Sequence, residues 1–320
     1  MKVLKTGSLG LVLFLATNAH ALDSTSHRLT IHMAETASWQ LSISNRLSET
    51  PASPLISNGE TKAFYRYQIK GEGGGFVVSR RELSHEDNSK PSTLLPDVSD
   101  LTAGASEAFR EIVFRADANL MPQDIVNLSD IHAKQRDYAR KTFGNDMADA
   151  MTKDQATSAS IIADNLWTEA LMASVRQVGL VVGVPWAESD TVPSLARGAD
   201  AAAHTTIILN RWDAVTGRAT YTVTTQVDPD ATAAQLTAFF QNFLYPLNTM
   251  DEDQIATWKR KSAELAAAAE YTSGKTCTLS ADIRTGLIVE GHCLIELHLK
   301  SALFSQSVER DLHFSQVPAT

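Results

Sequence analysis

The residues best suited to chemistry lie near the C-terminal end of this 320-residue chain, where imidazoles and carboxylates alternate with apolar side chains. In the segment 287–300 the odd positions are mostly apolar and the even positions hold polar groups. Those polar groups are Glu290, His292, Glu296 and His298. A β-strand over this segment would bury the odd face and place all four polar side chains on the other face, because side chains alternate along a strand.

The next segment supplies Asp311 and His313, which a strand would also place on one face. A turn near 304–306 would bring His298 roughly opposite His313 on the neighbouring strand. Histidine with carboxylate suits zinc coordination or general acid–base catalysis, so the candidate metal ligands are His292, His298 and His313. A polar, solvated sheet face gives the same pattern, and that interpretation stays open.

A second candidate site is an aromatic and aliphatic stripe on two predicted helices. The first helix follows Asp228-Pro229, a cap and a first-turn proline, and the second begins at the capping box of Thr249 and Glu252. The candidate ligand-binding residues on these helices are Leu236, Phe239, Phe240, Phe243 and Trp258. Such a stripe forms either one wall of an apolar ligand groove or ordinary hydrophobic core.

Two cysteines, Cys277 and Cys293, flank a predicted hairpin turn at Asp282–Gly286. In that turn the aspartate can cap backbone amides and the glycine can adopt the left-handed conformation. Each cysteine lies eight residues from residue 285, so folding the chain there places them opposite each other on paired strands. We therefore predict a structural disulfide.

Composition and missing motifs exclude several classes of function. The chain has no nucleophile elbow, no P-loop and no dinucleotide fingerprint. It carries 28 basic against 37 acidic side chains, a formal net charge of −9, and no basic stripe with interleaved aromatics. An acidic surface repels phosphate backbones, so we expect no nucleic-acid partner. We also expect no cofactor.

The first 21 residues have the features of a secretory signal peptide. Lys2 and Lys5 precede the short apolar run Leu9–Ala16, and Ala19-His20-Ala21 provides small residues at the cleavage positions. We predict cleavage after Ala21, without a lipid anchor because no cysteine follows. The loss of two lysines would take the formal net charge from −9 to −11.

No later segment offers the roughly 18 apolar residues that a spanning helix needs. The mature chain is therefore expected to have no transmembrane segment and to be periplasmic or secreted.

The N-terminal region, 22–100, is predicted to be β-structure. Alternation between His27 and Leu47 indicates one long curved strand, or two strands joined by an odd-numbered loop. Further alternation from Ala63 to Ile69, then the glycine-rich stretch 71–75, indicates a hairpin rather than a phosphate-binding loop, because no helix follows the glycines.

The middle region, 101–180, is predicted to be helical. Around Ile112–Phe114 a short helix and a strand are both compatible with the pattern, whereas 122–143 has the spacing of a longer helix. A capping box that begins at Thr152 opens a helix continuing to Val178.

The C-terminal region, 181–320, is predicted to mix strands and helices. A hairpin is expected around Asp213–Gly217, whose Asp-x-x-Thr-Gly pattern matches that of Asp282–Gly286 and suggests a repeated structural unit. The chain ends in an antiparallel, disulfide-linked meander of three strands. Their predicted ranges are 276–283, 287–300 and 307–316.

The predicted fold class is α+β, with a curved, half-barrel-like antiparallel sheet packed against helices and a helical middle segment. The three regions after the signal peptide either fold separately or form one integrated domain over 22–320.

A signal peptide, long alternating strands, Asp-x-x-Thr-Gly hairpins and helices beside a sheet together resemble the periplasmic lipoprotein-carrier-like half-barrel proteins. The resemblance is one of pattern over 22–90 and 200–316, without a specific motif, and it carries over no functional residue. It implies a curved antiparallel sheet, covered by helices, that holds acyl chains. The helical stretch from about 105 to 178 is larger than that fold requires.

The leading hypothesis is therefore an exported, soluble, non-enzymatic protein that binds an apolar ligand or a cell-envelope partner. One alternative is a metal-dependent enzyme that uses the histidine and carboxylate face of the C-terminal strands. Another is a structural module for protein–protein interaction.

Overall fold

The structure is a computed structural model of the chain. It describes the residues 25–34, 36–50, 59–88, 107–145, 157–192, 201–228, 231–232, 236–237, 252–301 and 305–318. The predicted signal peptide, residues 1–21, lies outside these ranges.

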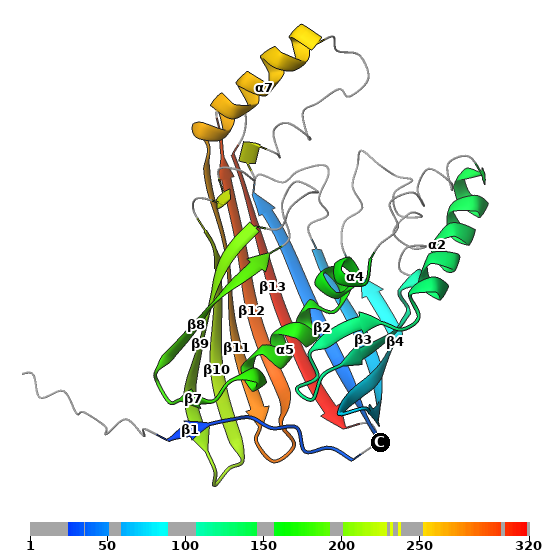
Figure 1. The fold of residues 1–320 in the computed structure, drawn as a ribbon, viewed down its shortest axis with the longest axis vertical. Helices are drawn as coiled ribbons and strands as arrows, with labels where there is room; N and C mark the ends of the chain where they lie inside the picture. Colours follow the sequence, from blue (N-terminus) through cyan, green and yellow to red (C-terminus); the bar gives the residue numbers. More distant parts are fainter. Residues whose placement is uncertain are drawn as a thin grey trace, which may run out of the picture.

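A single 11-stranded antiparallel sheet dominates the described residues (Figure 1). From one edge to the other its strands follow the order β6, β5, β4, β3, β2, β13, β12, β11, β10, β9, β8, and the two edges do not pair, so the sheet is open. The N-terminal strands are β2 (Thr36–Thr50), β3 (Gly59–Glu72), β4 (Gly75–Asp87), β5 (Glu111–Ala116) and β6 (Pro122–Ile125). The later strands are β8 (Pro185–Val192), β9 (Ala201–Asp213), β10 (Arg218–Val227), β11 (Glu270–Asp282), β12 (Leu287–Lys300) and β13 (Ser305–Pro318).

Strand β2 joins the N-terminal and C-terminal parts of the sheet. It pairs with β3 on one side and with β13 on the other, where Phe314 lies opposite Ile43. The predicted β-regions at the two ends of the chain therefore contribute to one continuous sheet, although some 250 residues separate β2 from its partner β13.

Four helices lie among the described residues, namely α2 (Leu128–Phe143), α4 (Ser158–Asn165), α5 (Trp167–Gln177) and α7 (Glu252–Ala267). Helix α5 lies across one face of the sheet, between β8–β10 on one side and β4–β6 on the other (Figure 1). Its apolar residues pack with the inward side chains of the strands in one core cluster. We call this surface the α5 face and the other surface of the sheet the opposite face. None of the described helices is long and apolar enough to cross a membrane.

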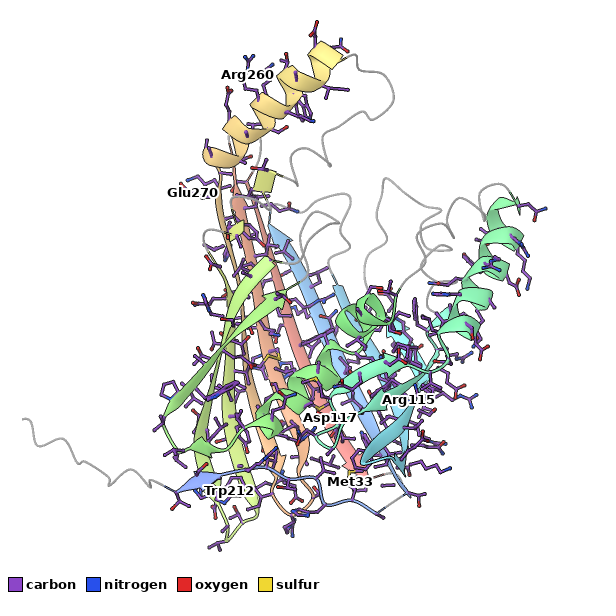
Figure 2. All side chains as sticks on the ribbon, in the orientation of Figure 1. Met33, Arg115, Asp117, Trp212, Arg260 and Glu270 are labelled. Carbon is purple, nitrogen blue, oxygen red and sulfur yellow. A yellow bond between two sulfur atoms is a disulfide. The ribbon has the colours of Figure 1, made fainter. Side chains whose placement is uncertain are left out.

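The ends of the sheet differ in what covers them. Tight turns close the lower end in Figure 1, where Gly73, Gly217 and Gly286 adopt positive φ values of 60°, 70° and 74°. Helix α7 lies at the upper end, and the chain enters β11 at Glu270 (Figure 2). A small second sheet pairs β1 (Ser26–His27) with β7 (Leu180–Val181).

Several predicted elements are confirmed. The glycine-rich stretch is a hairpin turn between β3 and β4, and both Asp-x-x-Thr-Gly segments join paired strands. In the first of them Asp213 Oδ1 accepts hydrogen bonds from the amides of Val215 and Thr216. In the second, Asp282 Oδ1 accepts one from the amide of Arg284. The two hairpins are neighbours in the sheet, because β10 pairs with β11.

Other predictions were wrong in their boundaries. The alternation that begins at His27 is not one strand: β1 and β2 belong to different sheets. The alternation in 28–34 instead reflects a chain that crosses the bottom of the α5 face, where Leu29 is buried.

The middle region is less helical than predicted. Ile112–Phe114 lies in β5, and the predicted helix 122–143 starts with strand β6, because β5 pairs with β4 and β6 pairs with β5, which extends the sheet. The helix predicted to run to Val178 is divided at Leu166 into α4 and α5. Its observed capping box is formed by Thr157 and Ser160, and Thr152 lies outside the described residues.

Candidate functional site

The lower half of the α5 face is filled by α5. Leu171, Met172 and Val175 are at most 5% exposed and belong to the main core cluster. The space left beside the helix is about 20 Å³ and is lined by residues that include Trp39 and Tyr67. A space of this size holds at most one water molecule.

Polar groups fasten α5 to the sheet. Glu169 Oε1 accepts a 2.5 Å hydrogen bond from the Tyr67 hydroxyl and lies 3.5 Å from Arg80 Nε, and all three side chains are buried. Burial lowers the pKa of Arg80, but the interactions with Glu169, Tyr67 and Tyr65 together outweigh it, so the net shift is upward. Burial, with the charge of Glu169, raises the pKa of Tyr67 well above its usual value. The guanidinium and carboxylate therefore form a charged pair inside the core.

A second buried arginine holds the C-terminal end of α5. Arg176 donates hydrogen bonds to the backbone oxygens of Gly286, at 3.0 Å, and Asn119. Burial lowers its pKa to about 10, which leaves the guanidinium charged at neutral pH. Carbonyl oxygens thus replace the water that this cation loses.

The upper end of the sheet contains a cavity of about 510 Å³ beneath α7. It forms where β10 ends at Val227 while β11 continues to Glu270, so that the edge of β11 extends past its neighbour. The lining residues are Gln226, Val227, Thr232, Leu236, Ala266, Ala267, Ala269, Tyr271, Thr272, Ser273, Gly274, Glu296 and His298.

The cavity lining has an apolar part and a polar part. Leu236, Ala266 and Tyr271 belong to a small hydrophobic cluster of their own, separate from the main core. At the other side lie Glu296 and His298, both exposed, and His298 Nδ1 is 2.9 Å from the Ser307 hydroxyl. The cavity therefore offers apolar contact at one side and polar groups at the other.

The predicted ligand-binding residues are only partly described. Leu236 lines the cavity and is 2% exposed. Trp258 is half-buried on α7, is not among the lining residues, and its carbonyl accepts a 2.9 Å hydrogen bond from Ser262. Phe239, Phe240 and Phe243 lie outside the described residues, so their role stays a prediction.

On the opposite face, His292 and His313 lie directly across from each other on β12 and β13. His292 Nε2 is 2.6 Å, and His313 Nε2 3.3 Å, from the same oxygen of Asp311. The two imidazole rings are stacked, with centroids 4.2 Å apart. We call these three residues the histidine–aspartate cluster.

The predicted pairing of His298 with His313 was wrong. The register places His298 opposite Ser307 and His292 opposite His313, so the partner of His313 stands six residues earlier on β12 than predicted. His298 is six residues from His292, about 20 Å along a strand. It therefore lines the cavity and is separate from the histidine–aspartate cluster.

The predicted disulfide between Cys277 and Cys293 is confirmed, and the residues are directly opposed on β11 and β12. A β-bulge sets this register. The turn pairs Asp282 with Leu287, a register that would place His292 opposite Cys277, and the unpaired Val289 shifts the pairing by one residue. The same shift directs Cys293 into the core and His292 to the opposite face.

Sequence reasoning missed the buried polar groups of α5. Glu169 and Arg176 stand seven residues apart on the apolar side of a helix, a spacing that places them on the same face. Two charged residues on an apolar helix face were a signal of buried partners, but nothing in the sequence indicated Arg80 as one of them.

No protein-family model matches this chain, and no curated protein matches it in sequence. Among solved structures it is similar to a chain of lipovitellin, from a structure titled for lipid–protein interactions in that protein. The TM-score is 0.39 at 9% sequence identity, and the match covers 89% of this chain and 25% of that chain. The chain thus spans about a quarter of the length of the lipovitellin chain.

Proposed function

We propose that this protein is an exported, non-enzymatic binding protein that takes the apolar chain of a small amphipathic molecule into the cavity beneath α7. The observation that carries the proposal is the contrast in free space between the two ends of the sheet: about 510 Å³ under α7, at the edge of β11 where residues of both faces line the cavity, against about 20 Å³ beside α5. Ligand pockets in proteins have volumes of roughly 300–1,000 Å³, so the upper cavity has the size of a binding site.

The lining favours an amphipathic ligand over a purely apolar one. Leu236, Ala266 and Tyr271 provide a surface for an aliphatic chain, and burial of such a chain is favourable in proportion to the apolar area removed from water. Gln226, Thr232 and Ser273 provide hydrogen-bonding groups at the same cavity. A ligand with one polar end would satisfy both sets of contacts.

The charge of the lining favours a neutral or cationic polar end. Glu296 is the only carboxylate among the lining residues that the structure describes, and no lysine or arginine is among them. An anionic group placed beside Glu296 would be repelled. Uncharged or cationic amphiphiles are therefore expected to bind more tightly than fatty acid anions of the same chain length.

Export is part of the proposal. The features of residues 1–21 predict secretion, and the disulfide between Cys277 and Cys293 is a bond typical of oxidising compartments. Mass spectrometry of protein recovered from the extracytoplasmic fraction should give a mature N-terminus at Leu22. Recovery of the full-length chain from the cytoplasm would contradict this part.

Binding is tested with the uncharged fluorescent probe N-phenyl-1-naphthylamine, together with mass spectrometry of lipids extracted from the native protein. The matched pair of variants is Ala267→Trp, which introduces a large side chain at the cavity, and Ala268→Trp, one residue on, at an exposed position that does not line it. We expect Ala267→Trp to weaken probe binding by about tenfold or more, the equivalent of at least ~1.4 kcal/mol, and Ala268→Trp to leave it unchanged.

Two results would overturn the ligand proposal. The first is that no amphiphile is extracted from the native protein and the purified protein does not take up the probe. The other is that both tryptophan variants bind as the unmodified protein does. Specific recovery of an envelope protein with the cavity empty would instead favour the envelope-partner hypothesis.

A further inference from the structure

The histidine–aspartate cluster is a set of metal-ligating atoms outside the cavity. His292 and His313 each present Nε2, Asp311 presents a carboxylate oxygen, and the three ligand atoms all lie within 4.8 Å of one another. Two imidazole nitrogens and one carboxylate oxygen are a donor set used by Zn²⁺ and other late first-row divalent ions.

The sheet itself brings these groups together. His292 and His313 form a directly opposed cross-strand pair in the centre of the 11-stranded sheet, and Asp311 stands two residues before His313, on the same face of β13. Both strands are paired on both sides, β12 with β11 and β13 with β2, so the backbone positions of the three ligands are fixed. A preorganised backbone lowers the entropy lost when a metal binds.

We propose that the histidine–aspartate cluster is a divalent transition-metal site, with Zn²⁺ as its expected ion. His292 and His313 bind through Nε2 and Asp311 through its carboxylate, which leaves at least one position for water. The cavity proposal is independent of this site, because the cluster lies four or more residues along β12 from Glu296 and His298.

The side chains have the freedom that coordination needs. The imidazole planes differ by only 10°, so the rings must tilt toward each other for both nitrogen lone pairs to reach one ion. The side chains of His292 and His313 are 50% and 60% exposed, which leaves room for this rotation. Ligand separations near 3.3 Å, as already found between His313 and Asp311, match a tetrahedral ion with bonds of about 2.0 Å.

The charged residues nearest the cluster on this face are one arginine and two glutamates. Arg46 lies opposite Asp311 on β2, Glu290 lies two residues from His292 on β12, and Glu309 lies two residues before Asp311 on β13. Before metal binds, Asp311 accepts a hydrogen bond from a neighbouring imidazole. A bound dication would displace that proton and would be attracted by the negative charge of the carboxylate.

The experiment titrates ZnCl₂ into the full mature protein, prepared without a histidine tag, and measures heat release. Unmodified protein should bind one ion per chain. His292→Ala and His313→Ala should each weaken binding at least about tenfold, since even loss of an outer-shell partner costs 10–100-fold. His298→Ala, on the same face of β12, should leave Zn²⁺ affinity unchanged.

A spectroscopic measurement distinguishes the site from diffuse surface binding. Co²⁺ in place of Zn²⁺ should give d–d absorption that disappears in the His292→Ala/His313→Ala double variant. Circular dichroism checks that the variants are folded. Equal Zn²⁺ affinity in all variants, or a loss of affinity only in His298→Ala, would overturn the proposal, whatever the result of the probe-binding experiment on the cavity.

Discussion

The lower and upper halves of the sheet are covered by helices in different ways (Figure 1). In the lower half, α5 packs its buried side into the main core and is fastened by Arg80, Glu169 and Arg176. In the upper half, α7 contacts the sheet through a small cluster around Leu236, Ala266 and Leu299, and a cavity remains. One half therefore serves stability, and the other half has the free volume that binding requires.

The contrast separates a packed half from an open half. Free volume gives up packing contacts, so the open half is expected to contribute less to the free energy of unfolding than the packed half. The buried ion pair and the disulfide strengthen the region beside and below the cavity.

Removing one partner of the buried ion pair should have the largest effect. In Glu169→Leu the charge of Arg80 loses its counter-charge in the core, and we expect a loss of about 3–5 kcal/mol in the free energy of unfolding. Urea unfolding measures it. The double variant Arg80→Leu/Glu169→Leu should recover part of the loss. A loss below about 1 kcal/mol in Glu169→Leu would mean that this pair does not secure α5.

Removing the disulfide should have the next largest effect. Its cysteines are 16 residues apart, and closing a loop of that length in the unfolded chain stabilises the fold by about 3 kcal/mol. Cys277→Ala/Cys293→Ala should lose roughly this amount in urea unfolding under non-reducing conditions. The control compares the unmodified protein with and without a reductant. An unfolding midpoint in the double-alanine variant equal to that of the unmodified protein would contradict the prediction.

A matched pair of leucine truncations compares the two halves directly. Leu171→Ala opens a new hole in the packed half and should cost about 3 kcal/mol. Leu236→Ala enlarges a cavity that already exists, so its cost should be about 1 kcal/mol while probe binding changes. Similar losses at both positions would show that the upper half is as tightly packed as the lower half.

The smallest effect concerns acid stability of the lower turns. Hydrogen bonds from Thr216 lower the pKa of Asp213, and Arg284 lowers the pKa of Asp282, each below its usual value of 3.8. A carboxyl group whose pKa is lower in the folded state stabilises the fold at pH values above its unfolded-state pKa. This stabilisation is lost as the pH falls through the folded-state pKa. Asp213→Asn/Asp282→Asn should therefore be less stable than the unmodified protein at pH 6 and equally stable near pH 2. A difference that stays constant with pH would mean that the carboxylate charges do not contribute.

Local patterns predicted much of the C-terminal sheet. Alternation predicted the bounds of β12, those of β13 to within two residues at each end, and the start of β11 to within six residues. The Asp-x-x-Thr-Gly segments indicated the two turns, because a capping aspartate and a left-handed glycine satisfy requirements of the turn itself. The cysteines opposed each other as predicted, although a bulge at Val289 was needed to produce that register.

The candidate sites were harder to predict, because they depend on register and on distant partners. The sequence pattern predicted His298 as the partner of His313. The observed partner is His292, six residues earlier on β12. The segment of β6 was predicted to be helical, and that of β5 was left open between helix and strand. Both extend the sheet edge formed by β4, which ends more than 20 residues before β5, so the local pattern did not indicate the pairing. A short apolar segment takes the conformation that its neighbour offers.

The sequence alone determined the elements that depend on neighbours a few residues away: the alternating strands, the turns, the helix α7 and the disulfide between Cys277 and Cys293. Only the tertiary structure decided that β2 pairs with β13, that Glu169 meets Arg80, and that His292 meets His313 beside Asp311. The physical reason is that side-chain periodicity fixes which face of a strand is buried, whereas the choice of a partner strand is made among every edge of the sheet. That choice placed α5 over one half of the sheet and left the cavity in the other.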